Sequence, residues 1–206
     1  MARIALVTGG TRGIGRAISE ALKDAGRTVI ANYAGNDEKA RQFTEETGIA
    51  TKKFDVGSFD ACQTAVQEIA EEFGNIEILV NNAGITRDGT LMRMSLEDWE
   101  DVIRTNLGSC FNLSRAVFGA MRENNFGRIV NIGSMIALRP AAFVAAYSAS
   151  KTGLRGLTQS VALDLAARGV PIRVNMVHPG AIRTPMYERY KFSGADTPEN
   201  IETGFA

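Results

Sequence analysis

The 206-residue chain contains little cysteine and histidine and carries no net charge at neutral pH. Its two cysteines, Cys62 and Cys110, stand apart from each other without metal-ligand spacing. The single histidine, His178, has no second histidine with which to share a metal ion. We therefore expect no metal site, and two unpaired thiols that suit a reducing compartment, the cytoplasm.

Long apolar runs and charged tails are also missing. The chain has 23 Lys and Arg residues against 23 Asp and Glu residues, and neither sign gathers into a tail that would bind nucleic acid or a membrane surface. The apolar run at the N-terminus is too short for a signal peptide, and no later run is long enough to cross a bilayer. We expect neither nucleic acid nor a membrane as a partner.

Short apolar runs alternate with segments of helical periodicity along most of the chain. This alternation is typical of βαβ units and predicts an α/β fold, a doubly wound parallel sheet of the Rossmann type, in a single domain over residues 1–206. In such sheets, ligands bind beyond the carboxyl ends of the strands. The six predicted strands cover residues 4–7, 28–31, 50–54, 76–80, 129–132 and 172–177.

A glycine-rich loop follows the first predicted strand and has the sequence TGGTRGIG. Glycine at 9, 13 and 15 allows a tight turn and lets the backbone approach a diphosphate, which the next helix N-terminus would face. A glycine-rich turn without a ligand is the alternative interpretation. The residues of this loop that we expect to contact a dinucleotide are Gly9, Thr11, Arg12, Gly13, Ile14 and Gly15.

Asn32, just after the second predicted strand, is a further expected cofactor contact, and the residues around it favour NADP(H) over NAD(H). An acidic residue near this point would bind both ribose hydroxyls of NAD, but residues 31–35 contain none. Without that carboxylate a 2′-phosphate is not repelled, and Arg12 could pair with it. Arg12 could instead be an ordinary surface arginine.

Two further strand ends supply candidate contacts to the adenosine half of the cofactor. Asp55, with Val56 beside it, follows the third strand and could accept a hydrogen bond from the adenine amino group; a simple turn aspartate is the alternative. Asn82, Ala83 and Gly84 follow the fourth strand and would line the ribose.

Tyr147 and Lys151 are four residues apart, which places them on one face of a helix. An ammonium within a few ångström would favour the phenolate and lower the pKa of the tyrosine, so that the pair could carry out acid–base chemistry. A solvated lysine one turn after a partly buried tyrosine is the plainer interpretation of this spacing.

These motifs, together with Asn106, Ser134 and the Pro179-Gly180 pair, occur in an order that resembles the short-chain dehydrogenase/reductase family, in its NADP-preferring subgroup, over residues 1–186. The NAGITRD sequence at 82–88 and MRM at 92–94 look like the 3-oxoacyl-(acyl carrier protein) reductases and acetoacetyl-CoA reductases. The resemblance implies NADPH-dependent reduction of a 3-oxoacyl thioester to the 3-hydroxyacyl form.

The resemblance also implies a role for each catalytic candidate. Tyr147 would be the general acid, and Ser134 would bind the substrate carbonyl oxygen. Lys151 would hold the nicotinamide ribose and lower the pKa of Tyr147, while Asn106 would anchor a water molecule of a proton relay. A strand-end serine and a buried helical asparagine are the structural alternatives for Ser134 and Asn106. Further cofactor contacts would come from Pro179, Gly180, Ile182 and Thr184, the last at the nicotinamide carboxamide.

Two segments depart from the family pattern. Residues 138–146 are mostly apolar where the acyl reductases have a polar, glycine-rich run, so other ketones or secondary alcohols are alternative substrates. Residues 181–206 look like an incomplete substrate lid, and the usual seventh edge strand is missing, which leaves a non-catalytic dinucleotide-binding module as another alternative. The family also implies a homo-oligomer, a dimer or a tetramer.

Overall fold

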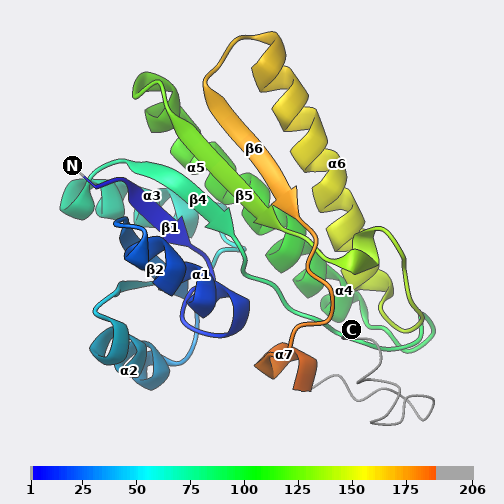
Figure 1. Ribbon diagram of the computed structural model, residues 1–206. Coiled ribbons are helices and arrows are strands. Elements are labelled where there is room, and N and C mark those ends of the chain that lie inside the picture. Colours follow the sequence, from blue (N-terminus) through cyan, green and yellow to red (C-terminus); the bar gives the residue numbers. More distant parts are fainter. Residues whose placement is uncertain (1, 189–206) are drawn as a thin grey trace.

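A parallel sheet of six strands in the order β3-β2-β1-β4-β5-β6 forms the centre of the molecule, in a computed structural model that describes residues 2–188 (Figure 1). The predicted α/β fold of the Rossmann type is confirmed, and so is each predicted strand. The predicted lid lies outside the described residues from 189 onward. The strands are β1 Ile4–Val7, β2 Thr28–Tyr33, β3 Ala50–Lys53, β4 Ile76–Asn81, β5 Gly127–Ile132 and β6 Ile172–Val177.

Strand β2 is two residues longer than the apolar pattern predicts. Asn32 and Tyr33 continue the strand because they pair with Lys52 and Lys53 of β3. Their polar side chains carry no hydrophobic signal, so this extension comes from strand pairing and could not be read from periodicity.

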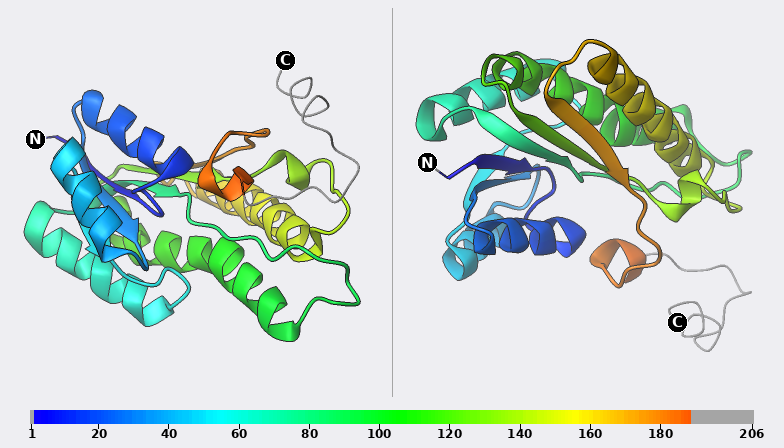
Figure 2. Two further views of the ribbon diagram at one scale, coloured as in Figure 1. Left: turned by 90° about the horizontal axis from the view of Figure 1, so that it is seen from below. Right: turned by 45° about the horizontal axis from the view of Figure 1, so that its top comes forward.

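Helices cover both faces of the sheet (Figure 2). Helices α1 and α2 lie on one face, and α3, α5 and α6 lie on the other. A π-helical turn, η1 (Arg104–Gly108), joins α4 to α5, and a short 3₁₀ turn, η2 (Met135–Ala137), follows β5. The helices are α1 Gly13–Asp24, α2 Asp37–Thr47, α3 Phe59–Phe73, α4 Leu96–Ile103, α5 Ser109–Glu123, α6 Ala145–Ala167 and α7 Pro185–Glu188.

The core divides into two parts because successive strand residues point to opposite faces. Ile4 and Leu6 of β1 belong to the larger part, under α3, α5 and α6, whereas Ala5 and Val7 belong to the part under α1 and α2. Each fully buried leucine or isoleucine side chain stabilises the fold by about 1.5–3 kcal/mol. Helices thus pack against both faces of the sheet, and this packing fixes the positions of the strand ends relative to one another.

Side-chain caps mark the starts of three helices. Asn36, Ser58 and Ser95 accept hydrogen bonds from the amides of Lys39, Ala61 and Asp98, which satisfies one free donor at the start of α2, α3 and α4 respectively. Helix α1 begins differently, because its N-cap residue, Arg12, makes no capping bond with its side chain. The first amides of α1 are therefore left for another acceptor.

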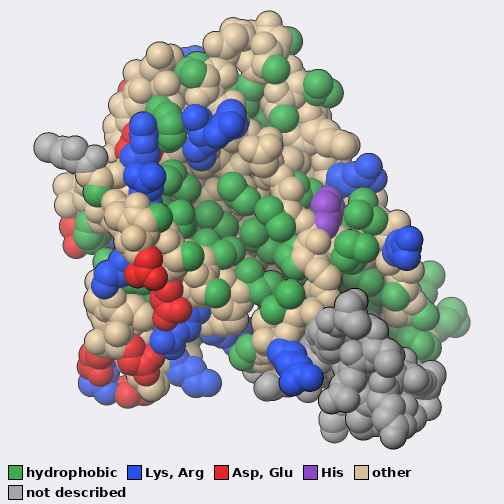
Figure 3. Space-filling view, in the orientation of Figure 1, with side chains coloured by type: hydrophobic (Ala, Val, Ile, Leu, Met, Phe, Trp, Pro, Cys, Tyr) green, Lys and Arg blue, Asp and Glu red, His purple; other side chains and the backbone are tan. Residues whose placement is uncertain are grey.

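Helices α1 and α2 do not cover all of their face of the sheet. Among residues 2–188, part of the surface that β5 and β6 form on this face is exposed to solvent. Arg173, Asn175 and Val177 alternate with buried residues of β6 and are exposed there, Val177 by 51%. Hydrophobic side chains gather in a shallow area on this side of the molecule (Figure 3).

Within the part of the chain that the structure describes, no helix combines the length and apolar character that crossing a membrane requires.

Candidate active site

The carboxyl ends of all six strands lie at one edge of the sheet, and each predicted site residue lies in, or directly after, one of them or on the helix that follows. Hydrogen bonds and close contacts join most of these segments to one another. The predicted site is therefore assembled from six separate stretches of chain.

Thr8 and Asn82 bind the glycine loop to the loop after β4. The hydroxyl of Thr8 accepts hydrogen bonds from the amides of Asn82 and Ala83 at 2.8 and 2.9 Å. In return, the side-chain amide of Asn82 donates to the carbonyl of Thr8 at 2.8 Å and to that of Gly9 at 3.3 Å. Two of the predicted cofactor segments thus form one bonded unit, in which the side chain of Asn82 serves to hold the loop.

Gly15 shows why this loop needs glycine. A Cβ atom at this position would lie 2.2 Å from the carbonyl oxygen of Gly9 and 2.5 Å from the side-chain nitrogen of Asn82. Gly9 and Gly13 have φ angles of +58° and +53°, in the left-handed region that favours glycine. The backbone can fold back tightly only because these positions lack side chains.

Asn32 lies beneath the glycine loop and supports it. Its side-chain oxygen accepts from the amide of Gly9 at 3.2 Å, and its side-chain nitrogen donates to the carbonyl of Phe54 at 3.0 Å. The residue is only 2% exposed, and both polar atoms of its side chain are used by the protein. A contact of Asn32 with the cofactor therefore stays a prediction, whereas its support of the loop is evident.

Asp55, predicted to contact adenine, is paired within the protein. Its carboxylate accepts from Arg104 at 2.7 Å and from the amide of Gly57 at 2.8 Å. Partial burial acts to raise the pKa of this carboxyl, but these two bonds outweigh it and hold the pKa below its ordinary value. Neighbouring Val56 is 5% exposed, and its carbonyl accepts from Asn112, so its side chain belongs to the core.

Asn106 lies in the π-helical turn η1 and is fully buried. Its side-chain oxygen accepts from the amide of Ile85 at 2.8 Å, and its nitrogen donates to the carbonyl of Ile85 at 3.0 Å and to the hydroxyl of Ser150 at 3.1 Å. The predicted water-anchoring role stays untested. The side chain instead joins the loop after β4 to α6, close to Gly84 and Lys151.

Ser134, Tyr147 and Lys151 form a connected group at the end of β5. The Ser134 side chain lies near the hydroxyl of Tyr147 and acts to lower its pKa, and the Ser134 hydroxyl accepts from the amide of Ile136 at 3.2 Å. The Lys151 ammonium donates to the carbonyl of Ile132 at 2.8 Å and lies 5.7 Å from the centre of the Tyr147 ring. The predicted placement of Tyr147 and Lys151 on one helical face is confirmed.

The expected lowering of the Tyr147 pKa is wrong for these side-chain positions. Burial raises the pKa of Tyr147 above its ordinary value, and the negative charge of Asp88 raises it further, while the nearby Ser134 side chain acts to lower it. Burial also lowers the pKa of the Lys151 ammonium, since its charged form loses hydration. Spacing in sequence predicted the pair but could not predict that desolvation would dominate.

The segment after β6 returns to the glycine loop. Thr184 lies near Gly13, because a Cβ atom built on Gly13 would be 3.5 Å from the Thr184 methyl carbon. At the beginning of this segment, the carbonyl of Pro179 accepts from the amide of Met135 at 3.0 Å. Residues 179–184 therefore run from the catalytic segment to the cofactor loop, with Gly180 and Ile182 between the two contacts, and their contacts with the cofactor stay predictions.

Sequence reasoning missed several residues that shape this site. Asp88 influences Tyr147, and burial raises the pKa of Asp88 itself. The amide of Gly89 donates to the carbonyl of Phe143 at 2.8 Å and joins the two loops on either side of the site. Phe143 has a φ of +66°, a left-handed conformation that this bond helps to hold. A single Asp-Gly pair in a loop carries no signal of such a contact.

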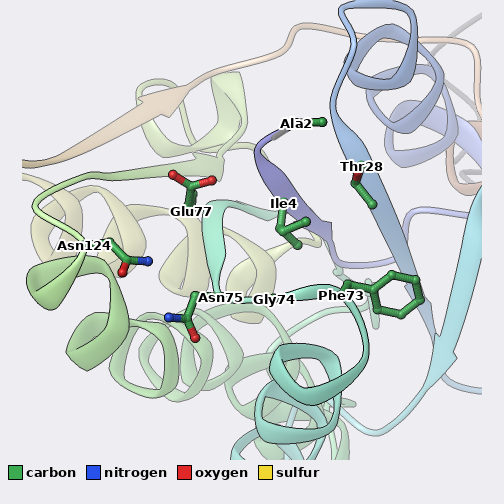
Figure 4. A pocket seen from close by; sticks show the side chains of 8 residues that line it. All are labelled: Ala2, Ile4, Thr28, Phe73, Gly74, Asn75, Glu77 and Asn124. Atoms are coloured by element: carbon green, nitrogen blue, oxygen red, sulfur yellow. The ribbon is translucent and has the colours of Figure 1, made fainter.

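A surface pocket lies at the opposite edge of the sheet, at the amino ends of the strands (Figure 4). Its carboxylate, Glu77, is already paired with Arg3 at 2.6 Å. None of the motif residues reaches this edge, so the carboxyl edge is the candidate active site. Among residues 2–188, no group of three or more His, Cys, Asp or Glu side chains could hold a metal ion. The pocket is lined by Ala2, Ile4, Thr28, Phe73, Gly74, Asn75, Glu77 and Asn124.

Comparison with known proteins gives a consistent result. Residues 3–192 match the protein family described as short chain dehydrogenase. The chain is 52% identical over 186 residues to an acetoacetyl-CoA reductase of Paracoccus denitrificans, covering 90% of this chain and 76% of that protein. It is 49% identical to an acetoacetyl-CoA reductase of Shinella zoogloeoides, with the same coverage. It is 45% identical to a 3-oxoacyl-(acyl-carrier-protein) reductase of Escherichia coli, covering 89% of this chain and 75% of that protein.

Proposed function

Since the chain belongs to the short-chain dehydrogenase/reductase family, whose members are oxidoreductases that use a nicotinamide dinucleotide, we propose that it is an NADPH-dependent reductase of 3-oxoacyl thioesters. Acetoacetyl-CoA and 3-oxoacyl-(acyl carrier protein) are the proposed substrates, and the 3-hydroxyacyl thioester is the product. The similar proteins, an acetoacetyl-CoA reductase and a 3-oxoacyl-(acyl-carrier-protein) reductase, support this substrate class.

The closeness of the Ser134 and Tyr147 side chains, through which Ser134 acts to lower the pKa of Tyr147, is the observation that carries the proposal. Two hydroxyl groups at the end of β5 can both donate to one carbonyl oxygen, which becomes negatively charged as the carbonyl is reduced. The cofactor supplies a hydride to the carbonyl carbon when it is bound. Tyr147 then transfers its proton to the oxygen, while Ser134 holds that oxygen in place.

The raised pKa of Tyr147 suits this direction of reaction. A general acid must carry its proton when the substrate arrives, and burial keeps the Tyr147 hydroxyl protonated at neutral pH. The Lys151 ammonium is held by the carbonyl of Ile132 at 5.7 Å from the centre of the Tyr147 ring, and its proposed role is to hold the nicotinamide ribose. The chain therefore has a proton donor beside a residue that would position the cofactor.

The glycine loop fits a dinucleotide phosphate. It has no room for a Cβ at Gly15, its Gly13 opens α1, and the first amides of α1 lack a side-chain cap. For the 2′-phosphate, the exposed Arg12 stands beside these amides. The nearest carboxylate after β2, Asp37, is already bonded to Tyr33 and Lys53. These features support NADP(H) over NAD(H).

Cofactor preference can be tested by calorimetry with NADPH and NADH. We expect NADPH to bind more tightly, and we expect Arg12→Ala to weaken NADPH binding by about tenfold while NADH binding changes less than twofold. Lys39→Ala, a change in α2 outside the loop, is the matched control for loss of a positive charge. A protein that prefers NADH and binds NADPH equally well after Arg12→Ala would refute this assignment.

The entrance to the site favours a substrate with an apolar part. Met135, Leu138 and Phe143, all between β5 and α6, are 41%, 46% and 49% exposed. An acyl chain could cover these side chains and stabilise binding by about 25 cal/mol for each Å² removed from water. The same surface would also suit other apolar ketones or secondary alcohols, which form the second candidate substrate class.

We include a homo-oligomer, a dimer or tetramer, and a cytoplasmic location in this proposal. Trp99, Phe111 and Leu163 are exposed by 37%, 53% and 72% on helices α4, α5 and α6, and an identical subunit could cover them. Cys62 and Cys110 are free and buried, as suits a reducing compartment. Sedimentation of the purified protein tests the oligomeric state.

The proposed activity is tested by following oxidation of NADPH with acetoacetyl-CoA, alongside simple ketones of matched size. We expect the thioester to have the highest kcat/KM, and we expect Ser134→Ala to reduce it by about 10²–10³ fold, as for loss of one oxyanion donor. Nucleotide binding without turnover of any ketone would instead support a non-catalytic dinucleotide-binding module.

A further inference from the structure

The chain's single histidine binds the main chain of the catalytic serine. His178 follows β6, and its Nδ1 atom lies 3.0 Å from the carbonyl oxygen of Ser134. A carbonyl oxygen only accepts hydrogen bonds, so Nδ1 must carry the hydrogen. The geometry thus selects one of the two neutral tautomers of the imidazole, with Nε2 unprotonated in the neutral ring.

The contact belongs to a series of three between the segments that leave β5 and β6. The amide of Gly133 donates to the carbonyl of Val177 at 2.7 Å, and the amide of Met135 donates to the carbonyl of Pro179 at 3.0 Å. Ser134 lies between these two main-chain bonds, and its carbonyl is held by the His178 side chain. His178 therefore supplies the one side-chain bond of this series.

Packing around Gly133 keeps the imidazole against the serine. A Cβ atom at Gly133 would lie 2.8 Å from His178 Nδ1 and 2.4 Å from the terminal methyl carbon of Met176. A glycine at this position allows the ring to approach the backbone closely. The position of His178 thus depends on the same short segment that carries the reacting hydroxyl.

We propose that His178 is a positioning residue that fixes the peptide carrying Ser134, so that the Ser134 hydroxyl points at the substrate oxygen; this inference rests on the proposed reductase function. The backbone at Ser134 is extended, with φ of −165° and ψ of 154°. A shift of the backbone at Ser134 would move its Cα atom, and the hydroxyl with it, relative to Tyr147. The hydrogen bond from His178 to the carbonyl of Ser134 opposes that shift. Neutral and cationic imidazole can both donate from Nδ1, so the bond does not require either charge state.

Two substitutions at His178 separate positioning from packing. His178→Ala removes the donor, and we expect kcat to fall by about tenfold, as for a small displacement of a catalytic group, with KM and the affinity for NADPH changed less than twofold. His178→Asn places an amide nitrogen near the position of Nδ1, and we expect it to restore kcat to within about threefold of wild type. A kcat that is unchanged in His178→Ala, or equally low in both variants, would overturn the proposal.

A double-mutant cycle with Ser134→Ala tests whether His178 acts through the serine. If it does, His178→Ala has no further effect on kcat once the Ser134 hydroxyl is gone. The same tenfold loss in both backgrounds would show an independent role and contradict the proposal. The melting temperature of each variant, measured alongside, shows whether a loss of kcat reflects unfolding.

The hydrogen bond itself can be tested without any activity. Because the chain has one histidine, long-range ¹H–¹⁵N spectra of protein labelled at histidine report on a single imidazole. We expect the tautomer protonated at Nδ1 in the neutral ring. A neutral ring protonated at Nε2 would overturn the proposal, whatever the enzyme does. A wild type that reduces no ketone would instead refute the proposed function, and the tautomer would still decide the bond between His178 and Ser134.

Discussion

The glycine loop between β1 and α1 and the segment between β5 and α6 are built in different ways. The glycine loop is held by local backbone geometry and by Asn32 and Asn82 beneath it, and its side chains are small. The segment from 133 to 144 has exposed apolar side chains, a 3₁₀ turn and a phenylalanine in a left-handed conformation. It is held to the rest of the site by contacts from the loops that follow β4 and β6.

This difference separates cofactor recognition from substrate recognition. A diphosphate needs backbone amides and space, which glycine provides at fixed positions. A substrate pocket needs side chains of particular size and charge, and these are held by contacts between distant segments, such as those of Gly89 with Phe143 and of His178 with Ser134. We therefore expect changes in the first region to affect cofactor binding and folding, and changes in the second to affect turnover and KM.

The largest effect on cofactor binding and stability is expected from Gly15→Ala. The added Cβ would clash with the carbonyl of Gly9, so the loop must open, at a cost of about 1–3 kcal/mol in the free energy of unfolding. The affinity for NADPH should fall by more than about tenfold, since the loop would no longer present its amides. Urea unfolding and calorimetry measure the two effects.

Gly119→Ala is the matched control for this change. Gly119 lies in α5, and a Cβ there would meet nothing within 4 Å. We expect it to raise the free energy of unfolding by about 0.5–1 kcal/mol, the usual gain from replacing a helical glycine by alanine, with NADPH affinity unchanged. Equal tolerance of both substitutions would show that the loop is not sterically constrained.

A smaller effect, limited to substrate handling, is expected at Gly89. Gly89→Pro removes the amide that donates to Phe143, so the two loops separate and KM for acetoacetyl-CoA should rise by about fivefold, the loss of a bond worth about 1 kcal/mol. Gly89→Ala keeps the amide and has open space around its Cβ, so KM should remain near that of wild type. NADPH affinity should not change in either variant. A proline variant with weakened NADPH binding and an unchanged KM would break the proposed separation of the two regions.

The smallest effect is expected from Asp88→Asn, as a shift in pH dependence. In reduction, Tyr147 must be protonated, so the rate falls as the pH rises through the pKa of Tyr147. The charge of Asp88 raises that pKa, so removing it should move the basic limb of the kcat profile to lower pH. Asp60→Asn, an exposed change on α3, should leave the profile in place. A shift to higher pH in Asp88→Asn would contradict this electrostatic assignment.

The parts of the molecule that follow local rules could be predicted from the sequence. Strands β1 and β6 agree with their predicted bounds, because the hydrophobic pattern of a strand acts within a few residues. The helical spacing of Tyr147 and Lys151 is likewise local.

Features set by distant contacts could not be predicted in the same way. The raised pKa of Tyr147 depends on burial by several elements, and the pairing of Asp55 with Arg104 joins residues 49 positions apart. The supporting role of Asn32 follows from its place between the glycine loop and β3. Each of these results requires the assembled fold, since sequence spacing carries no information about them.

The central claim, that Tyr147 is the proton donor of a carbonyl reductase, is tested most directly by Tyr147→Phe, with NADPH affinity measured beside single-turnover reduction of acetoacetyl-CoA. The substitution keeps the ring and removes only the hydroxyl. We predict NADPH binding within about twofold of wild type and a reduction rate lower by at least about 10²–10⁴ fold, the usual contribution of a general acid. A variant that binds NADPH and reduces acetoacetyl-CoA at the wild-type rate would contradict the proposed mechanism.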